Sequence, residues 1–334
     1  MNGTSGIHLE NMKKVNTVRG VIDTSLLGVT LMHEHIFVLS PEINQNYPES
    51  WGNEEIRVQN AIDRLRKLKL QGVDSIVDLT VVGVGRYIPR IQRIAAQVDL
   101  NIIVATGLYT FNELPMYLQY RNSGSRSDSS EVLLEMILKD IHEGIADTGV
   151  KASILKCATD YQGVTPGVEL VLRTVARAHQ KTGLPVSTHT HAKSRSGLAQ
   201  QRIFEEEGVD LSRVVIGHCG DTTDLEYLER LLEKGSYLGM DRFGIETILP
   251  FKKRVDTVAA LCRLGYSEKI VLSQDAACYN DWFEEEALAT AVPNWNYFHL
   301  LKDVVPALRE SGVTEDQIHT MLVKNPRRIF EGNS

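Results

Sequence analysis

Two histidines one residue apart, His33 and His35, are the first side chains in the sequence whose spacing suggests chemistry. In an extended segment alternate side chains point the same way, so both imidazoles can bind one metal ion. The pair alone leaves two interpretations open, a metal site or two hydrogen-bonded loop histidines. His189, His218 and Asp275 favour the metal site, because each of them ends or follows a short apolar run. Imidazole and carboxylate ligands suit Zn²⁺, Co²⁺, Mn²⁺ or Fe²⁺.

Lys156 is the unusual member of this set. It ends the apolar run 152–156, where its amine would be buried close to the metal ions. Burial and nearby cations both favour the neutral amine, which can take up CO₂ to form a carbamate able to bridge two metals. The alternative is a lysine that extends its ammonium to solvent from a strand end. The residues alone leave both alternatives open.

The elements that must position these side chains are short apolar runs alternating with amphipathic segments. The expected strands are 29–32, 75–80, 102–106, 152–157, 185–190, 214–218, 237–242 and 270–273. The expected helices lie near 54–71, 86–98, 131–147, 167–182, 198–208, 223–234, 251–264, 297–311 and 314–323. Eight such units predict parallel strands covered by helices, in an α/β fold of the (β/α)8 TIM-barrel class. Every candidate ligand then lies at the C-terminal end of a strand, the face where barrels carry their active sites.

The strand count alone leaves an open, doubly wound sheet as the alternative fold. Gly83-Val84-Gly85 gives that fold no support, because it lacks the third glycine of a dinucleotide-binding fingerprint. Two connections, 110–130 and 276–296, are too long to be simple turns. Long loops at the C-terminal face of a barrel are where pockets are built.

The composition limits the partners and the compartment. The 334-residue chain has 43% hydrophobic and 24% charged residues and a formal net charge of −7, which argues against a nucleic acid or an anionic membrane as the main partner. No stretch approaches the roughly 20 apolar residues that span a bilayer, and residues 1–14 lack the apolar core of a secretory signal. The four dispersed cysteines favour reduced thiols and a cytoplasmic location. We expect residues 1–16 to form a flexible tail and residues 17–331 to form a single domain.

Ordered motifs carry a family resemblance that covers residues 17 to about 331. They are TVRG (17–20), LMHEH (31–35), ILKCA (154–158), STHTH (187–191), IGHCGD (216–221), MDRFG (240–244) and SQD (273–275). With these motifs the chain resembles the phosphotriesterase family of the amidohydrolase superfamily, and within it the phosphotriesterase-like lactonase branch. The resemblance implies a binuclear metal centre at the C-terminal face of the strands, with Zn²⁺ as the first expectation.

The resemblance also assigns the ligands to two groups. It implies that His33, His35 and Asp275 hold one metal, and that His189 and His218 hold the other. Spacing could not choose between the two histidines of STHTH, since both face the same way; the resemblance selects the first of them.

The implied reaction is hydrolysis by a hydroxide that bridges the two metals together with a carbamate formed from CO₂ on Lys156. Asp275 would accept the proton and Asp221 would help to relay it outward. Tyr109 matches a family tyrosine that orients the substrate oxygen over the metals. The alternative role of Tyr109 is packing beneath the following loop.

Four residues are expected to bind substrate. They are Tyr109, Arg242, Cys278 and Trp282. Arg242 matches an arginine of the branch, with a structural ion pair to Asp241 or Glu246 as its alternative. Cys278 and Trp282 fall in the loop 276–296 where the branch forms its acyl channel, although the aromatic residues there are equally suited to packing the loop onto the barrel.

The expected function is therefore hydrolysis of lactones, either N-acyl-homoserine lactones or related γ/δ-lactones, with weak promiscuous phosphotriesterase activity. A dedicated organophosphate or aryl-ester hydrolase with the same two metals is the first alternative. A metal-binding protein without catalysis is a more remote one. Members of the branch look like homodimers, so we expect a homodimer here. The chain departs from the branch at Gln274, where histidine is frequent, and at Phe111, where some members have tyrosine. These differences affect the expected acyl-chain preference and leave the expected chemistry unchanged.

Overall fold

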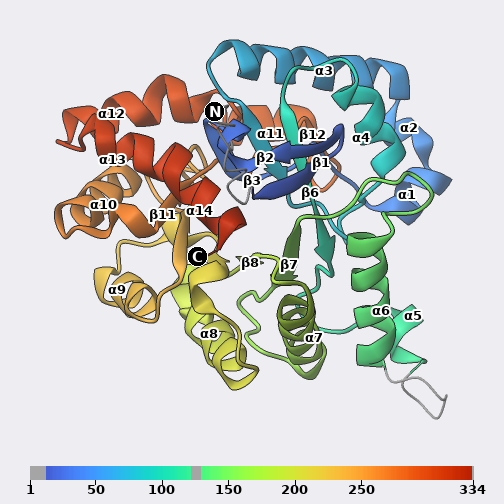
Figure 1. Ribbon diagram of the computed structural model, residues 1–334. Coiled ribbons are helices and arrows are strands. Elements are labelled where there is room, and N and C mark those ends of the chain that lie inside the picture. The colour runs from blue at the N-terminus through green and yellow to red at the C-terminus, as the bar shows by residue number, and fades with distance from the viewer. Residues whose placement is uncertain (1–12, 122–128, 333–334) are drawn as a thin grey trace, which may run out of the picture.

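The expected barrel strands are all present. The computed structural model describes residues 13–121 and 129–332. Within these ranges eight parallel strands form one sheet, in the order β3-β5-β6-β7-β8-β9-β10-β11 (Figure 1). The strands are β3 (Thr30–Glu34), β5 (Ser75–Asp78), β6 (Asn101–Gly107), β7 (Ile154–Ala158), β8 (Val186–His189), β9 (Val214–Ile216), β10 (Tyr237–Met240) and β11 (Ile270–Leu272). Nearly every strand residue is buried, which explains why the runs are apolar rather than alternating.

The sheet closes into a barrel between its first and last strands. His35 N donates a hydrogen bond to Ala276 O at 2.9 Å, and Asp275 N donates one to His33 O at 2.9 Å. These bonds lie just beyond β11, so the barrel closes at the end where the expected ligands lie. The (β/α)8 TIM-barrel class is confirmed.

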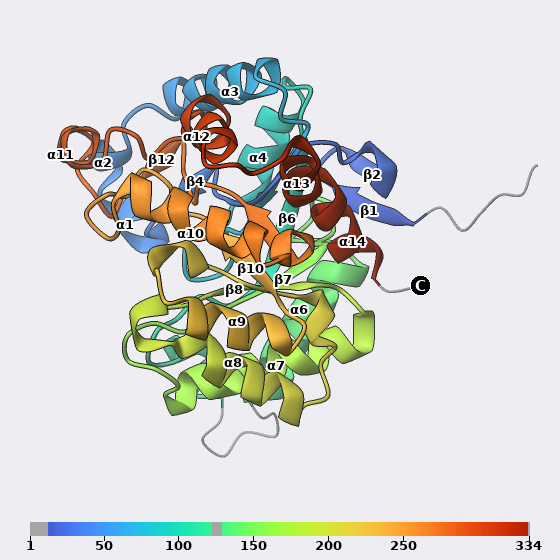
Figure 2. The ribbon, with the colours of Figure 1, turned by 90° about the vertical axis from the view of Figure 1, so that its left-hand side faces the viewer.

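Helices surround the barrel, as Figures 1 and 2 show. They are α3 (Glu54–Leu70), α4 (Ile88–Ala95), α6 (Ser129–His142), α7 (Pro166–Thr182), α8 (Ser196–Glu206), α9 (Leu225–Glu233), α10 (Phe251–Arg263) and α12 (Val305–Glu310). Local signals explain their limits. In α7, the Thr165 side chain accepts from Val168 N, Pro166 occupies the first turn, and Gly183 ends the helix in the left-handed conformation. No helix of the described ranges is long and apolar enough to cross a membrane.

Several short elements in the connections were not expected. They are β4 (Phe37–Val38), α1 (Pro41–Asn46), α2 (Pro48–Trp51), α5 (Met116–Gln119), β12 (Tyr279–Asn280) and α11 (Glu285–Ala291). Strands β4 and β12 pair in parallel, which ties the base of the 276–296 loop to the segment after β3. Residues 122–128 of the other long connection lie outside the described residues.

The two ends of the described chain close the barrel at its N-terminal face. The strands β1 (Lys14–Thr17) and β2 (Gly20–Asp23) form an antiparallel hairpin, so ordered structure begins within the segment 1–16 expected to be a tail; residues 1–12 lie outside the described residues. After the helix α13 (Glu315–His319) the chain ends in α14 (Asn325–Glu331). Val15 and Ile329 pack into the cluster that fills the barrel interior. Figure 2 shows the hairpin and α14 at one end and α1, α2 and α11 at the other.

Candidate metal centre

All six expected metal ligands lie in or directly after barrel strands, at one end of the barrel. They are His33, His35, Lys156, His189, His218 and Asp275. Five of these side chains are buried and that of His35 is 11% exposed. The structure therefore brings together, from five strands, side chains that are far apart in the sequence.

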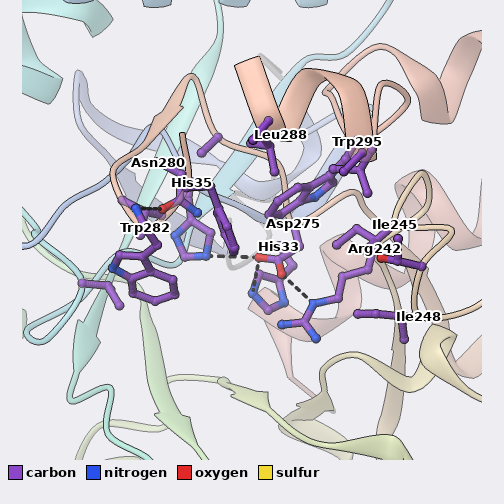
Figure 3. A pocket seen from close by; sticks show the side chains of 18 of the residues that line it. His33, His35, Arg242, Ile245, Ile248, Asp275, Asn280, Trp282, Leu288 and Trp295 are labelled. Carbon is purple, nitrogen blue, oxygen red and sulfur yellow. Dashed lines mark hydrogen bonds and ion pairs between the residues drawn. The ribbon is translucent and has the colours of Figure 1, made fainter. Parts of the chain in front are cut away.

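The Asp275 carboxylate lies close to both His33 and His35, the two histidines expected to bind the same metal (Figure 3). Its Oδ1 atom is 3.2 Å from His35 Nε2 and 3.4 Å from His33 Nε2. His33 Nε2 is also 3.2 Å from Lys156 Nζ. Among the described residues, ligand atoms of His33, His218 and Asp275 all fall within 4.8 Å of one another. This is the compactness that a shared metal requires.

His189 and His218 meet on the other side of the centre. His218 Nε2 lies 2.8 Å from His189 Nδ1, so both rings present a nitrogen to the same point. Burial lowers the pKa of His189 to about 3 and lowers those of His33 and His218. The three imidazoles are therefore neutral at physiological pH and have a free lone pair, as metal binding requires.

One buried carboxylate orients two of the rings. Asp241 Oδ1 lies 2.7 Å from His218 Nδ1, and Asp241 Oδ2 lies 3.1 Å from His33 Nδ1. A partner on one ring nitrogen fixes the ring and leaves the other nitrogen for a metal. Sequence reasoning did not identify Asp241 in this role, although its position directly after β10 at the ligand-bearing end was a usable signal.

The other two rings are held in the same way. His35 Nδ1 is 2.8 Å from Thr80 Oγ1, and Thr80 Oγ1 donates in turn to Asp78 Oδ1 at 2.5 Å. His189 Nε2 is 3.2 Å from Asp160 Oδ2. Each of the four imidazoles thus has one nitrogen within 3.2 Å of an outer oxygen atom and one directed inward. This donor set, imidazole nitrogens with one central carboxylate, fits divalent Zn, Co, Mn or Fe.

Lys156 is 1% exposed and lies inside the cluster rather than reaching solvent. Burial lowers the pKa of its amine to about 8. The solvent-reaching alternative does not describe this side chain. An amine of this pKa has a substantial neutral fraction near neutral pH, which is the form that can react with CO₂.

Three residues of the centre share a strained backbone conformation. His218, Arg242 and Asp275 have φ values of 60°, 61° and 55°, in the left-handed region that few non-glycine residues adopt. Each follows a barrel strand, where the chain must turn sharply to send a side chain over the barrel axis. Strain of this kind collects at functional sites, where the surrounding structure holds it in place.

Arg242 joins the centre to a second acidic residue. Its Nε donates to Asp275 Oδ2 at 2.9 Å and its Nη1 donates to Asp221 Oδ2 at 3.1 Å. Among the described residues, Arg242 forms ion pairs with these two carboxylates. It forms none with Asp241 or Glu246, the partners that a purely structural role would have given it. Burial opposes the charge of Arg242, but the two carboxylates raise its pKa, so it stays protonated.

Arg254 pairs with Asp221, the acidic residue that Arg242 also contacts. Arg254 was not identified from the sequence. It is 0% exposed, and its Nη1 lies 2.7 Å from Asp221 Oδ1. Its guanidinium also donates to Gly220 O at 2.7 Å and to Ile245 O at 3.3 Å. Arg254 lies on α10, and an arginine on an amphipathic helix gives no sequence signal that it points into the core.

Tyr109 lies over the centre from the loop after β6. Its hydroxyl is 3.3 Å from His189 Nδ1, and its ring contacts Phe111 with centroids 4.9 Å apart. Burial raises the pKa of Tyr109, so the hydroxyl keeps its proton. It can therefore donate a hydrogen bond to an oxygen bound at the centre.

A cavity of about 620 Å³ opens directly above the cluster. Its floor is polar and its walls are apolar, as Figure 3 shows. The walls include Ile245, Ile248, Trp282, Phe283, Leu288 and Trp295. Gly244 lets the two wall-forming loops meet, because its φ is 94° and a Cβ there would lie 2.3 Å from Asn294 O. The cavity can enclose an apolar substituent whose polar end reaches the candidate metal ligands.

Two residues considered from the sequence do not face this cavity. Cys278 is 7% exposed, with Sγ 3.4 Å from Tyr297 Oη, and it lines a second cavity on the other side of α11. The second histidine of STHTH, His191, is half-buried and its Nδ1 is 3.0 Å from Ser194 Oγ. Trp282, by contrast, lines the cavity and is 45% exposed at its mouth.

Comparison with known proteins places these features in a family. The model of the phosphotriesterase family matches residues 13–330. A Mycobacterium tuberculosis protein named phosphotriesterase homology protein is 62% identical over 320 residues, which are 96% of this chain and 98% of the relative. An aryldialkylphosphatase of Saccharolobus solfataricus is 37% identical over 311 residues, 92% and 96% of the two chains. A solved structure of a phosphotriesterase from M. tuberculosis is similar with a TM-score of 0.93 at 62% identity, over 95% of this chain and 98% of the other.

Proposed function

Because this chain belongs to the phosphotriesterase family of metal-dependent hydrolases, we propose that it is a lactonase. Its substrates are N-acyl-homoserine lactones or related γ- and δ-lactones. The observation that supports this is the apolar cavity directly above the His/Asp cluster. Burial of an acyl tail against its walls contributes about 0.8 kcal/mol for each buried methylene. A compact aryl phosphate would leave much of this surface unused.

We further propose that two divalent metal ions, Zn²⁺ first among them, are held by the two ligand groups. His33, His35 and Asp275 form one group, and His189 and His218 form the other. Lys156 would bridge the two as a carbamate formed from CO₂. When bound, the two ions would lower the pKa of a water molecule and polarise the substrate carbonyl.

The side chains of this protein supply the remaining steps. Burial alone would raise the pKa of Asp275, but its charged and hydrogen-bonding neighbours, Arg242 among them, hold it well below its usual range. Asp275 is therefore ionised and can accept the proton of the attacking water. Arg242 stays protonated and contacts both Asp275 and Asp221, so it holds the two carboxylates beside one charge, and we propose Asp221 as the next acceptor for a proton that leaves Asp275.

Tyr109 and Arg242, which both line the cavity, are proposed to orient the substrate. Tyr109 can donate its hydroxyl proton to a substrate oxygen, since it stays protonated. Arg242 supplies a fixed positive charge beside the point where negative charge develops on the oxygen. The apolar walls above exclude water once an acyl tail fills them.

The proposal is tested by comparing kcat/KM for a long-chain acyl lactone and for paraoxon on protein whose metal content has been measured. We expect at least about a tenfold preference for the lactone, with paraoxon as a weak activity. A tenfold preference for paraoxon would overturn the lactonase assignment in favour of a dedicated organophosphate hydrolase. Tight metal binding without turnover of any ester, lactone or phosphotriester would indicate a binding protein without catalysis.

Trp282→Ala is expected to affect long substrates selectively. The indole ring lines the cavity mouth, and its centroid is 6.1 Å from that of Tyr109. Its loss should raise KM for a decanoyl lactone about tenfold and leave that for an acetyl lactone within about twofold, because only the long tail reaches it. Ile56→Ala, at a residue 60% exposed on α3, is the matched control. Equal effects on both substrates would remove Trp282 from the acyl site.

We also propose a cytoplasmic homodimer. All four cysteines are buried free thiols, which suits a reducing compartment. Large apolar side chains remain exposed on the single chain, among them Tyr47 and Met116 at 57% and 72%, and burying such residues is what a partner copy would do.

A further inference from the structure

Glu34 lies between two of the proposed metal ligands and has no part in the chemistry described so far. Strand alternation turns its side chain away from those of His33 and His35, and it is 0% exposed. Among the described residues, no lysine or arginine forms an ion pair with it. A buried carboxylate is costly unless hydrogen bonds compensate it, so its partners identify its role.

The hydrogen-bond partners of the Glu34 carboxylate all come from one short segment. Oε1 accepts from Ser273 Oγ at 3.0 Å and from Gln274 N at 2.8 Å. Oε2 accepts from Ala276 N at 2.9 Å. The two backbone donors are the residues immediately before and after Asp275. Converging N–H groups around a residue in the left-handed conformation form a natural anion site, and here a carboxylate of the same chain fills it.

This anion site lies where the barrel has no regular strand pairing. The sheet order runs from β3 round to β11, and no strand ladder joins these two in the described residues. The backbone bonds between His33 and Asp275 and between His35 and Ala276 close this gap. The Glu34 carboxylate adds its three bonds across the same gap.

We propose that Glu34 is the positioning residue for Asp275. By binding the amides on both sides of Asp275, it holds that residue at a φ of 55°. The Asp275 carboxylate then lies within 3.4 Å of both histidines of its group. Glu34 thereby couples the first ligand pair to the ligand from the last strand. This inference rests on the proposed role of Asp275 as a metal ligand.

Four proteins test the proposal: the parent, Glu34→Gln, Asp275→Asn and the double variant. Each is freed of metal with a chelator and titrated with Co²⁺ alone, and binding is followed by absorption. Glutamine keeps the shape of Glu34 but turns a donor toward at least one backbone N–H. We expect Glu34→Gln to weaken Co²⁺ binding about 10- to 100-fold. Its kcat should fall while KM stays within about twofold.

The double variant separates positioning from general support of the fold. If Glu34 acts through Asp275, then Glu34→Gln costs less than about twofold in Co²⁺ affinity once Asp275 is already asparagine. A full, additive loss in that background overturns the proposal. Unchanged Co²⁺ affinity in the single Glu34→Gln protein overturns it as well. Glu226→Gln, at a side chain 73% exposed, is the matched control and should stay within about threefold of the parent.

The outcome for Asp275→Asn alone distinguishes this inference from the proposed function. If Asp275→Asn leaves Co²⁺ affinity unchanged, the ligand assignment fails and the inference fails with it. If Asp275→Asn weakens binding and Glu34→Gln does not, only the inference fails. Glu34→Asp keeps the charge but withdraws the carboxylate by one methylene, and it replaces the glutamine variant in the same cycle if that variant does not fold.

Discussion

Asp275→Asn is expected to lower kcat about 10³- to 10⁴-fold while the fold is retained. The amide cannot accept the proton of the attacking water. It is also a weaker metal ligand, and it loses the charge that pairs with Arg242 at 2.9 Å. Three functions of one carboxylate are removed together, so this is the largest effect we expect from the replacement of one heavy atom.

The measurement is kcat and KM at fixed metal content, with circular dichroism to follow the fold. Asp99→Asn is the matched control, because its side chain is 86% exposed and pairs with Arg19 at the surface. That variant should retain the parent rate. A rate for Asp275→Asn within tenfold of the parent, with metals bound, would contradict the proton-acceptor role.

Lys156→Met is expected to reduce kcat/KM on the order of 10³-fold, because losing several kcal/mol of metal-based stabilisation costs a factor of ten for each 1.36 kcal/mol. Methionine matches the buried, unbranched side chain and removes only the amine, so packing in the barrel is retained. Metal bound per chain should fall in parallel. Lys252→Met, at a side chain 83% exposed, provides the control.

The parent protein also gives Lys156 a pH signature. Burial lowers the pKa of the amine to about 8, and only the neutral amine reacts with CO₂. With dissolved CO₂ held at a fixed concentration, reactivation of metal-free protein by Zn²⁺ should therefore accelerate about tenfold per pH unit up to pH 8 and level off above it. A reactivation rate independent of both pH and the CO₂ concentration would contradict carbamate formation on Lys156.

The sequence predicted the barrel and the gathering of candidate ligands at one of its ends for a simple physical reason. Strands buried on both faces must be apolar, so polar residues such as His189 and Lys156 at the ends of apolar runs stand out. Strand alternation then predicted that His33 and His35 share a direction. The family resemblance carried the choice of His189 over His191, which alternation could not make.

The residues that hold the ligands could not be predicted in the same way. Asp241 and Arg254 act across the fold, on His218 and Asp221, and such contacts depend on how strands and helices meet. Arg254 has the residue type of a solvent-facing helix position and yet is fully buried. Only the assembled fold shows which charged residues have buried partners.

The directions of side chains in the 276–296 loop could not be predicted either. Ala277 lines the cavity and its neighbour Cys278 turns into the core, because the two-residue strand β12 begins immediately afterwards and fixes the alternation. A strand of two residues has no hydrophobic period to detect. The resemblance placed Cys278 in the correct loop without giving the direction of its side chain.

The most direct test of the binuclear centre is a crystal structure of the protein grown with Zn²⁺ and bicarbonate, with data collected at the zinc absorption edge. We predict two anomalous peaks about 3.5–4 Å apart. One should lie beside His33, His35 and Asp275 and the other beside His189 and His218, with density for three additional atoms on Lys156 Nζ. A single peak, or two zinc ions with an unmodified Lys156 amine between them, would contradict this prediction.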